Sequence, residues 1–428
     1  MPAPWFLCYR SSCISVTEAF RRLVFRVESP VVLIGPPGVG KTMLARQAAE
    51  EYAQKRGLIF LDLTSNSRVS LPGCGGSLHD PSVRRCVVRR VEHDPERFML
   101  FYRMVMSHVL PEDVLGIPRV DESISLAYYH KPLPLRLMSI DGVHGLLFLD
   151  EVTSIARPDV RSLLYAILDE KRVGDTVLSS NVRIAAAGNR LVDDSDVMGL
   201  PAPVINRCIV VQVAPPSIEE WRDYMDKKYS EWWRELAGVL RLAPSLFQGV
   251  TQENEKLGKL PFPSPRSWEK VAAEIVPWVC GYRLRGKCRK YAGAVVGNAA
   301  WSRAVQVVRD AKKMGINLEK LAAGDQDVLS IITVENLERY REYVVEVVAY
   351  EWAVHNREDV VEVLAKTLAD MAAKTPDQVF AVITEMEKTA WSMMPRILEV
   401  MERLNVEGRI LEELEYRVKR LAENGLEI

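Results

Sequence analysis

Short apolar runs alternate with amphipathic segments over the first half of the chain. The run Val31 to Ile34 reads as a buried strand, and similar runs recur after it. The pattern predicts strands at 31–34, 58–63, 98–106, 146–149, 182–187 and 208–213, and helices at 17–27, 41–55 and 158–171. Apolar strands that alternate with helices are typical of a parallel sheet covered on both faces. We therefore expect an α/β domain over residues 1–215.

The pattern changes after Pro215, where strand-like runs nearly vanish and helical periodicity continues almost to the end of the chain. An aromatic-rich helical stretch occupies 218–240, and its Trp and Tyr residues are expected to pack in a core or against another subunit rather than to stack on bases. We expect a helical lid at 216–312 and a helical C-terminal region at 313–428. Residues 64–97, rich in glycine and arginine, interrupt the α/β pattern and are predicted to be an insertion.

Composition narrows the possible partners. The chain has 428 residues, which exceeds the usual size of one hydrophobic core. Its 56 Lys and Arg nearly balance its 57 Asp and Glu, so no long-range field draws the whole molecule to nucleic acid or to an anionic membrane. Two local basic clusters are expected to be solvated faces or subunit contacts, with nucleic acid as the alternative. They are Arg84, Arg85, Arg89 and Arg90, and then Arg283, Arg285, Lys287, Arg289 and Lys290.

The cysteines and the apolar segments bear on the compartment. Seven cysteines without a disulfide-scaffold pattern favour a reducing environment. No export signal and no membrane-spanning segment is evident, so we expect a cytoplasmic protein without a membrane partner. Four residues of the insertion could close a zinc site, although we expect them to be unrelated loop residues. They are Cys74, His79, Cys86 and His93.

A glycine-rich loop separates the first predicted strand from the next helix. Its pattern is Gly35-x-x-x-x-Gly40-Lys41-Thr42, in which glycines let successive backbone N–H groups curl around phosphate oxygens. Lys41 adds a positive charge, the Thr42 hydroxyl can bind Mg²⁺, and the helix points its positive end at the same phosphates. The predicted cofactors are ATP and Mg²⁺. The cofactor-binding residues are Gly35, Pro36, Pro37, Gly38, Val39, Gly40, Lys41, Thr42 and Met43.

Polar residues follow two of the later strands. Asp150 ends an apolar strand, where a P-loop protein needs an acid for Mg²⁺, so Thr42 and Asp150 are the predicted metal ligands. Glu151 could orient the attacking water or accept its proton. Asn189 follows the strand at 182–187, at the sheet edge where ligands of open α/β sheets bind. Taken alone, the acidic pair fits a helix cap equally well, and Asn189 fits the start of a turn.

These motifs resemble those of AAA+ ATPases, and most closely those of the MoxR branch. The matching segments are Gly35 to Thr42 (Walker A), Leu149-Asp150-Glu151 (Walker B), Ala187-Gly188-Asn189 (sensor 1), Pro203-x-x-Asn206-Arg207 (arginine finger) and Ser264-Pro265-Arg266 (sensor 2). The segment Pro111 to Pro118 carries the similarity to the MoxR branch. The resemblance extends over about residues 16–308, apart from 64–97, and implies a P-loop AAA+ core followed by a helical lid. Residues 121–140 lie where this branch carries its helix-2 insertion, a candidate pore or substrate element.

The resemblance also implies roles for individual residues. Glu151, Asn189, Arg207 and Arg266 are the expected catalytic residues. Glu151 would activate water, and Asn189 would sense the γ-phosphate. Arg207 would reach the nucleotide of a neighbouring subunit, so hydrolysis would require self-association in a ring, expected to be a hexamer. Arg266 would report nucleotide from the lid, in cis or in trans.

Three functions stay open from the sequence. The first is an ATP-driven, chaperone-like remodelling motor that acts on a protein partner, because the resemblance implies such partners, often proteins with a von Willebrand A domain. The second is a nucleic-acid-associated motor or loader, which the two basic clusters favour. The third is a nucleotide-gated assembly module that does not hydrolyse ATP.

Overall fold

The computed structural model describes residues 5–11, 13–64, 68–123, 126–190, 200, 205–229, 233–249, 261–406 and 408–423. Its contacts divide the chain into two compact units. One comprises residues 14–213, and the other comprises 1–13 together with 214–428. We call them the α/β unit and the helical unit. The three-part division at residues 215 and 312 stays a prediction.

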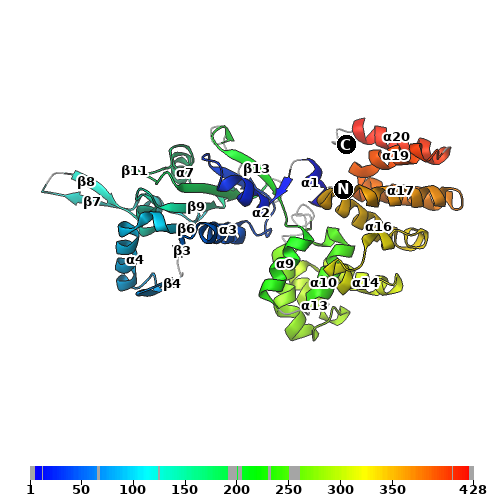
Figure 1. Cartoon of the computed structure of the whole chain (residues 1–428), viewed down its shortest axis with the longest axis horizontal. Helices are drawn as coiled ribbons and strands as arrows, with labels where there is room; N and C mark the ends of the chain where they lie inside the picture. The colour runs from blue at the N-terminus through cyan, green and yellow to red at the C-terminus, as the bar shows by residue number, and fades with distance from the viewer. Residues whose placement is uncertain are drawn as a thin grey trace. The chain divides into compact units, whose positions relative to one another are not determined.

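The α/β unit is built on a seven-stranded sheet (Figure 1). Its strands lie in the order β1-β13-β2-β12-β9-β6-β3, and every pairing from β13 to β3 is parallel. Their bounds are Cys13–Ser15 for β1, Val31–Ile34 for β2, Ile59–Asp62 for β3, Phe98–Val105 for β6, His144–Asp150 for β9, Val182–Gly188 for β12 and Ile209–Ala214 for β13. The α/β fold class, with a P-loop after β2 and helices around the sheet, is confirmed.

Alternation along the buried strands places hydrophobic side chains on both faces of this sheet. Within β2, Val31 and Leu33 pack on one face with α3 (Lys41–Arg56), α2 (Val16–Ala19) and η2 (Phe20–Val24), whereas Val32 packs on the other. The second face is covered by α4 (Pro81–His93), α6 (Leu133–Met138) and α7 (Pro158–Glu170). Because each strand is covered on both sides, the carboxyl ends of β2, β9 and β12 form a fixed edge for the loops that follow them.

The predicted insertion has regular structure that the sequence interpretation missed. It contains a hairpin of β4 (Arg68–Leu71) and β5 (Cys74–Ser77), followed by α4. Helix α4 begins after Asp80, whose carboxylate accepts a hydrogen bond from the Ser82 N–H, and buries Val83, Val87 and Val91 at a spacing of four residues. The insertion is therefore packed onto the core of the α/β unit. A second hairpin joins β7 (Ile117–Asp121) to β8 (Leu126–His130), and only β8 and the end of β7 lie within residues 121–140, the region compared with a helix-2 insertion.

Four of the cysteines form disulfides, which the sequence interpretation did not anticipate. Cys74 and Cys86 form a disulfide that joins β5 to α4, and Cys280 and Cys288 form another in the helical unit. The sequence shows no disulfide-scaffold pattern, because each pair lies within one local fold and gives no signature in sequence spacing. The support that the cysteines gave to a reducing compartment is therefore lost. Within the described residues no group of three or more His, Cys, Asp and Glu could hold a metal, and Cys74 and Cys86 are bonded to each other, so the structure gives no support to zinc at Cys74, His79, Cys86 and His93.

The helical unit has one hydrophobic core that extends from Phe6 to Leu421. Its helices are α9 (Ile218–Lys228), α10 (Arg234–Leu242), α12 (Pro265–Lys270), η7 (Val271–Cys280), α13 (Arg289–Val296), α14 (Asn298–Lys313), α15 (Leu318–Ala323), α16 (Val334–His355), α17 (Glu358–Ala372), α18 (Pro376–Thr389), α19 (Met394–Arg403) and α20 (Arg409–Glu423). Helices α17, α19 and α20 pack side by side (Figure 1). None of the helices in the described part of the chain is long and apolar enough to span a bilayer.

Most of the predicted aromatic stripe lies in this core, as expected. Trp221 and Trp233 are buried and make an edge-to-face contact with ring centroids 5.7 Å apart. Trp232 lies outside the described residues.

Around Tyr350 and Glu219 the core also holds a polar network, in which the Tyr350 hydroxyl donates to Glu219 at 2.7 Å and a His355 ring nitrogen lies 3.1 Å from the same carboxylate oxygen.

Candidate functional site

The loop between β2 and α3 adopts a conformation that requires glycine. Gly38 and Gly40 have φ angles of 78° and 89°, a region that L side chains rarely adopt. Gly35 packs so closely on β13 that a Cβ atom would lie 2.5 Å from the Val213 carbonyl oxygen. The three glycines of the motif are thus explained by the backbone, which turns sharply from the strand into the N-terminus of α3.

Lys41 is buried within this loop. Its ammonium donates hydrogen bonds to the carbonyl oxygens of Gly35 at 2.7 Å and Pro36 at 3.0 Å, and to the Asn189 side-chain oxygen at 3.2 Å. The sequence predicted that Lys41 and Asn189 serve one site, and the structure brings their side chains into contact. The positive charge is held at the mouth of the loop, where the start of α3 adds the positive end of its dipole.

The two predicted metal ligands are also in contact. The Thr42 hydroxyl donates to Asp150 Oδ2 at 2.7 Å, and the Glu151 backbone N–H donates to Asp150 Oδ1 at 3.1 Å. Asp150 ends β9 and is buried. A hydroxyl and a carboxylate oxygen at this distance are the hard ligands that Mg²⁺ takes. The residues present therefore fit a magnesium nucleotide, with Thr42 and Asp150 at the metal and Lys41 at the phosphates.

Arg103 is a residue of this site that the sequence interpretation missed. It lies on β6, the strand beside β9, and its guanidinium contacts Asp150 Oδ2 through Nε at 2.9 Å and Nη2 at 2.8 Å. Asp150 is thus shared between the Thr42 hydroxyl and a positive charge from the neighbouring strand. The parallel register pairs Arg103 with Phe148, two residues before Asp150, which no local motif in the sequence reveals.

Glu151 adopts an unusual backbone and has a partner of its own. Its φ and ψ of 57° and 36° are left-handed, which is uncommon for a residue other than glycine. The Ser107 hydroxyl, just beyond β6, donates a short hydrogen bond to Glu151 Oε2. One oxygen of the carboxylate proposed to activate water is therefore held by a residue that the sequence interpretation did not single out.

Thr153 holds the backbone of Asn189 in place. Its hydroxyl, in the short 3₁₀ helix η4 (Val152–Ser154), accepts the Asn189 backbone N–H at 3.0 Å. Gly188 fits closely against it, because a Cβ there would lie 2.4 Å from the Thr153 methyl carbon. The segment after β9 thus fixes the backbone at the end of β12.

The remaining predicted residues are placed as follows. Met43 is an exposed residue in the first turn of α3. Arg207 lies in the turn before β13, with 53% of its side chain exposed, and forms an ion pair with Asp169 of α7 at 2.8 Å. Arg266 is exposed in the first turn of α12, in the helical unit. Pro203, the first residue of the arginine-finger motif, lies outside the described residues.

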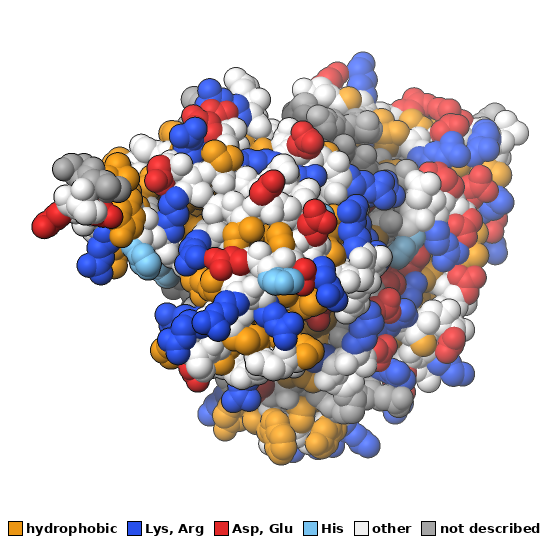
Figure 2. Space-filling view, turned by 60° about the vertical axis from the view of Figure 1, so that its left-hand side comes forward, with side chains coloured by type: hydrophobic (Ala, Val, Ile, Leu, Met, Phe, Trp, Pro, Cys, Tyr) orange, Lys and Arg blue, Asp and Glu red, His pale blue; other side chains and the backbone are white. Residues whose placement is uncertain are grey.

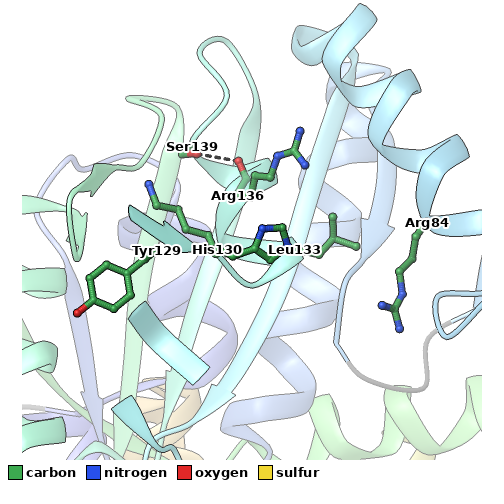
Figure 3. A pocket seen from close by; sticks show the side chains of 7 residues that line it. Arg84, Tyr129, His130, Leu133, Arg136 and Ser139 are labelled. Carbon is green, nitrogen blue, oxygen red and sulfur yellow. Dashed lines mark hydrogen bonds between the residues drawn. The ribbon is translucent and has the colours of Figure 1, made fainter. Parts of the chain in front are cut away.

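A separate cavity of about 650 Å³ lies in the α/β unit, beside the second hairpin and α4. Figure 3 shows Arg84, His130 and Arg136 around it. Arg136 is already paired with Glu92 at 2.6 Å, and the Arg84 Nε donates to the Leu78 carbonyl. Both arginines are therefore engaged by the protein itself, and the predicted nucleotide residues do not line this cavity.

Comparison with known proteins supports this description of the loop. Residues 31–78 match the model of the ATPase family associated with various cellular activities (AAA). The match begins at β2 and includes the P-loop, α3 and β3, and ends after β5. The match supports an AAA+ ATPase core in general and does not distinguish the MoxR branch from other branches.

Solved structures give weaker likenesses. The chain is 13% identical to PCH-2 of C. elegans, with 69% of this chain and 65% of that chain covered and a TM-score of 0.29. It is 12% identical to AMPPCP-bound DnaA of Aquifex aeolicus, with 96% and 86% covered and a TM-score of 0.26. For NtrX of Brucella abortus the identity is 13%, the coverage is 83% and 66%, and the TM-score is 0.26. Scores this low carry no argument about function. No curated protein matches the chain.

Proposed function

We propose that the chain is a Mg²⁺-dependent ATPase of the AAA+ type and that it hydrolyses ATP at the loop between residues 35 and 42. The observation that carries this proposal is the contact of Thr42 with Asp150 at 2.7 Å beside the contact of Lys41 with Asn189 at 3.2 Å. Four residues from three separate segments, each expected at a nucleotide site, meet at one sheet edge. A glycine turn without a nucleotide-binding role would not require these four side chains to lie together.

Within this proposal each residue has one task. Lys41 binds phosphate oxygens, Thr42 and Asp150 hold the metal, and Asn189 contacts the outermost phosphate. Mg²⁺, when bound, neutralises charge on the phosphates. Glu151 orients the attacking water or takes its proton, which requires that Ser107 release one carboxylate oxygen or share it.

We further propose that Arg207 completes a neighbouring subunit's site in a ring, expected to be a hexamer. Its exposed position is compatible with reaching another molecule, and its partner Asp169 would be exchanged for a phosphate oxygen. The MoxR-like resemblance favours a protein client, possible clients including proteins with a von Willebrand A domain. The exposed hydrophobic side chains of the β7–β8 hairpin, among them Val120 and Tyr128, suit contact with such a client. Arg266 is proposed to respond to nucleotide from the helical unit.

Two variants test the ATPase proposal. Lys41→Ala should lose nucleotide binding, measured by fluorescence titration with a labelled ATP analogue. Glu151→Gln should bind that analogue as the wild type does and release phosphate at least about 100-fold more slowly, because the general base is removed. Arg172→Ala, a surface change in the same unit, serves as the control. Wild-type turnover in either of the first two variants would refute the assignment.

A further inference from the structure

A segment of the helical unit combines basic and aromatic side chains on its surface. Residues 278–291, here named the 278–291 segment, run from the end of η7 through η8 (Gly286–Cys288) into the first turn of α13. Three aromatic residues of this segment, Trp278, Tyr282 and Tyr291, are exposed by 82%, 55% and 55%. Five cationic residues of the segment are exposed as well. They are Arg283, Arg285, Lys287, Arg289 and Lys290.

The charge of this segment is not balanced locally. The sequence contains no Asp or Glu between residues 275 and 309. Within the described residues, none of the five cations forms an ion pair with a carboxylate. One acid that contacts the segment is Glu235, whose carboxylate accepts the Leu284 backbone N–H and whose partial burial raises its pKa. That acid offsets part of the charge of Arg283.

The segment is also held in shape. The Cys280–Cys288 disulfide closes a loop whose ends lie 5.8 Å apart at their Cα atoms, and the buried Leu284 fixes its middle to the core. The cations at 283, 285 and 287 and the aromatic ring at 282 are therefore displayed on a short, crosslinked loop. A ligand that binds them encounters groups whose backbone is already ordered, which lowers the entropy cost of binding.

We propose that the 278–291 segment binds single-stranded nucleic acid. Regularly spaced cations attract a phosphate backbone, and exposed aromatic faces stack on bases. Only unpaired bases offer such faces, because duplex bases are stacked on one another. Hydrophobic and basic side chains gather at the lower end of the molecule in Figure 2, the end where Figure 1 places α13. Any coupling of this binding to ATP rests on the proposed function, whereas the binding itself does not.

Fluorescence anisotropy with a labelled 30-nucleotide oligo(dT) tests the proposal on the full-length protein. For contacts with all five cations, the logarithm of the dissociation constant should change by about 3.5 per tenfold change in salt, at roughly 0.7 per phosphate. Arg285→Ala/Lys287→Ala/Arg289→Ala should bind at least about tenfold more weakly at low salt and reduce that slope by about 2. Trp278→Ala should weaken binding by about fivefold or more, through lost stacking.

Control variants remove the same number of positive charges, or one exposed aromatic ring, elsewhere on the helical unit. Lys366→Ala/Lys374→Ala/Lys419→Ala removes three exposed positive charges, and Tyr416→Ala removes an exposed ring. Both should bind oligo(dT) as the wild type does. Lys41→Ala should bind it equally well, which separates failure of this inference from failure of the ATPase assignment.

Three results would overturn the proposal. The first is wild-type affinity and salt dependence in the triple variant of residues 285, 287 and 289. The second is equal affinity for a duplex of the same length, which would remove the role of unpaired bases. The third is binding to phosphatidylserine vesicles with no binding to the oligonucleotide, which would make the segment a membrane-surface element instead.

Discussion

Arg103 offers a sharp test of how the site is held together without ligand. Its guanidinium contacts Asp150 Oδ2 at 2.8 Å, and only 8% of the Asp150 side chain is exposed, against 35% for Arg103. Removing one partner of a fully buried pair costs about 3–5 kcal/mol, and the partial exposure of Arg103 reduces this by solvent screening to about 1–2 kcal/mol. We expect Arg103→Ala to destabilise the α/β unit by that amount.

The assay must report on the α/β unit alone. All nine tryptophans lie outside residues 14–213, so tryptophan fluorescence reports on the helical unit, and differential scanning calorimetry is needed for the other. For a unit of about 200 residues, 1–2 kcal/mol corresponds to a Tm lower by about 3–6 °C. Arg172→Ala, which removes an exposed pair with Glu170, should shift Tm by less than about 1 °C.

Adding nucleotide and Mg²⁺ distinguishes two roles for Arg103: an ion pair with Asp150 that persists with ligand, and one that Mg²⁺ replaces. If Arg103 stands in for the charge of Mg²⁺, saturating Mg²⁺ and a non-hydrolysable ATP analogue should shrink the deficit of Arg103→Ala, because Asp150 then has another cation. An unchanged Tm without ligand would refute the estimate of the ion pair. A deficit that is undiminished with ligand would refute the exchange of Arg103 for metal.

Three further predictions follow from single contacts. Ser107→Ala should raise steady-state phosphate release by up to about tenfold, because it frees a carboxylate oxygen of Glu151 from a hydrogen bond worth about 1.5–3 kcal/mol. An unchanged or lower rate would show that this hydrogen bond does not restrain Glu151. Gly188→Ala should cost about 1–3 kcal/mol by calorimetry, because its Cβ would lie 2.4 Å from the Thr153 methyl carbon, and Gly188→Ala/Thr153→Ser should recover part of the loss. Burial opposes protonation of His355, but the hydrogen bond from its ring to Glu219 and the negative charge of Glu219 outweigh burial and raise the pKa of His355. Its contribution to the free energy of unfolding is therefore complete below the unfolded pKa of about 6.5 and is lost as pH rises through the raised pKa of the folded state. His355→Gln should therefore lower stability towards urea more at pH 5.5 than at pH 9, followed by tryptophan fluorescence, and equal losses at both pH values would count against it.

The strands could be predicted because their residues carry the signal themselves. Val31 to Ile34 is apolar throughout and ends at glycine, and β2 has those bounds in the structure. The P-loop was predictable for the same reason, since its constraints are local: the positive φ angles at Gly38 and Gly40 demand glycine within a few residues of Lys41.

Contacts between segments far apart in the chain were not predictable. Arg103 reaches Asp150 and Ser107 reaches Glu151 only because β6 and β9 are neighbours in the sheet, and strand order is not written in either segment. Helix α4 is a different case, because Asp80 followed by Pro81 and valines at 83, 87 and 91 gave a helix signal. The glycines and arginines around it hid that signal.

The left-handed backbone at Glu151 makes the hydrogen bond from Ser107 matter for stability as well as for turnover. A side chain at this φ costs on the order of 1 kcal/mol, a penalty that glycine avoids. Glu151→Gly would remove this penalty and also the hydrogen bond from the Ser107 hydroxyl, worth about 1.5–3 kcal/mol, so glycine gains stability only where the Ser107 hydroxyl is already absent. Heat-resistant variants selected from a Ser107→Ala background should therefore be checked for Glu151→Gly and for phosphate release before they are used.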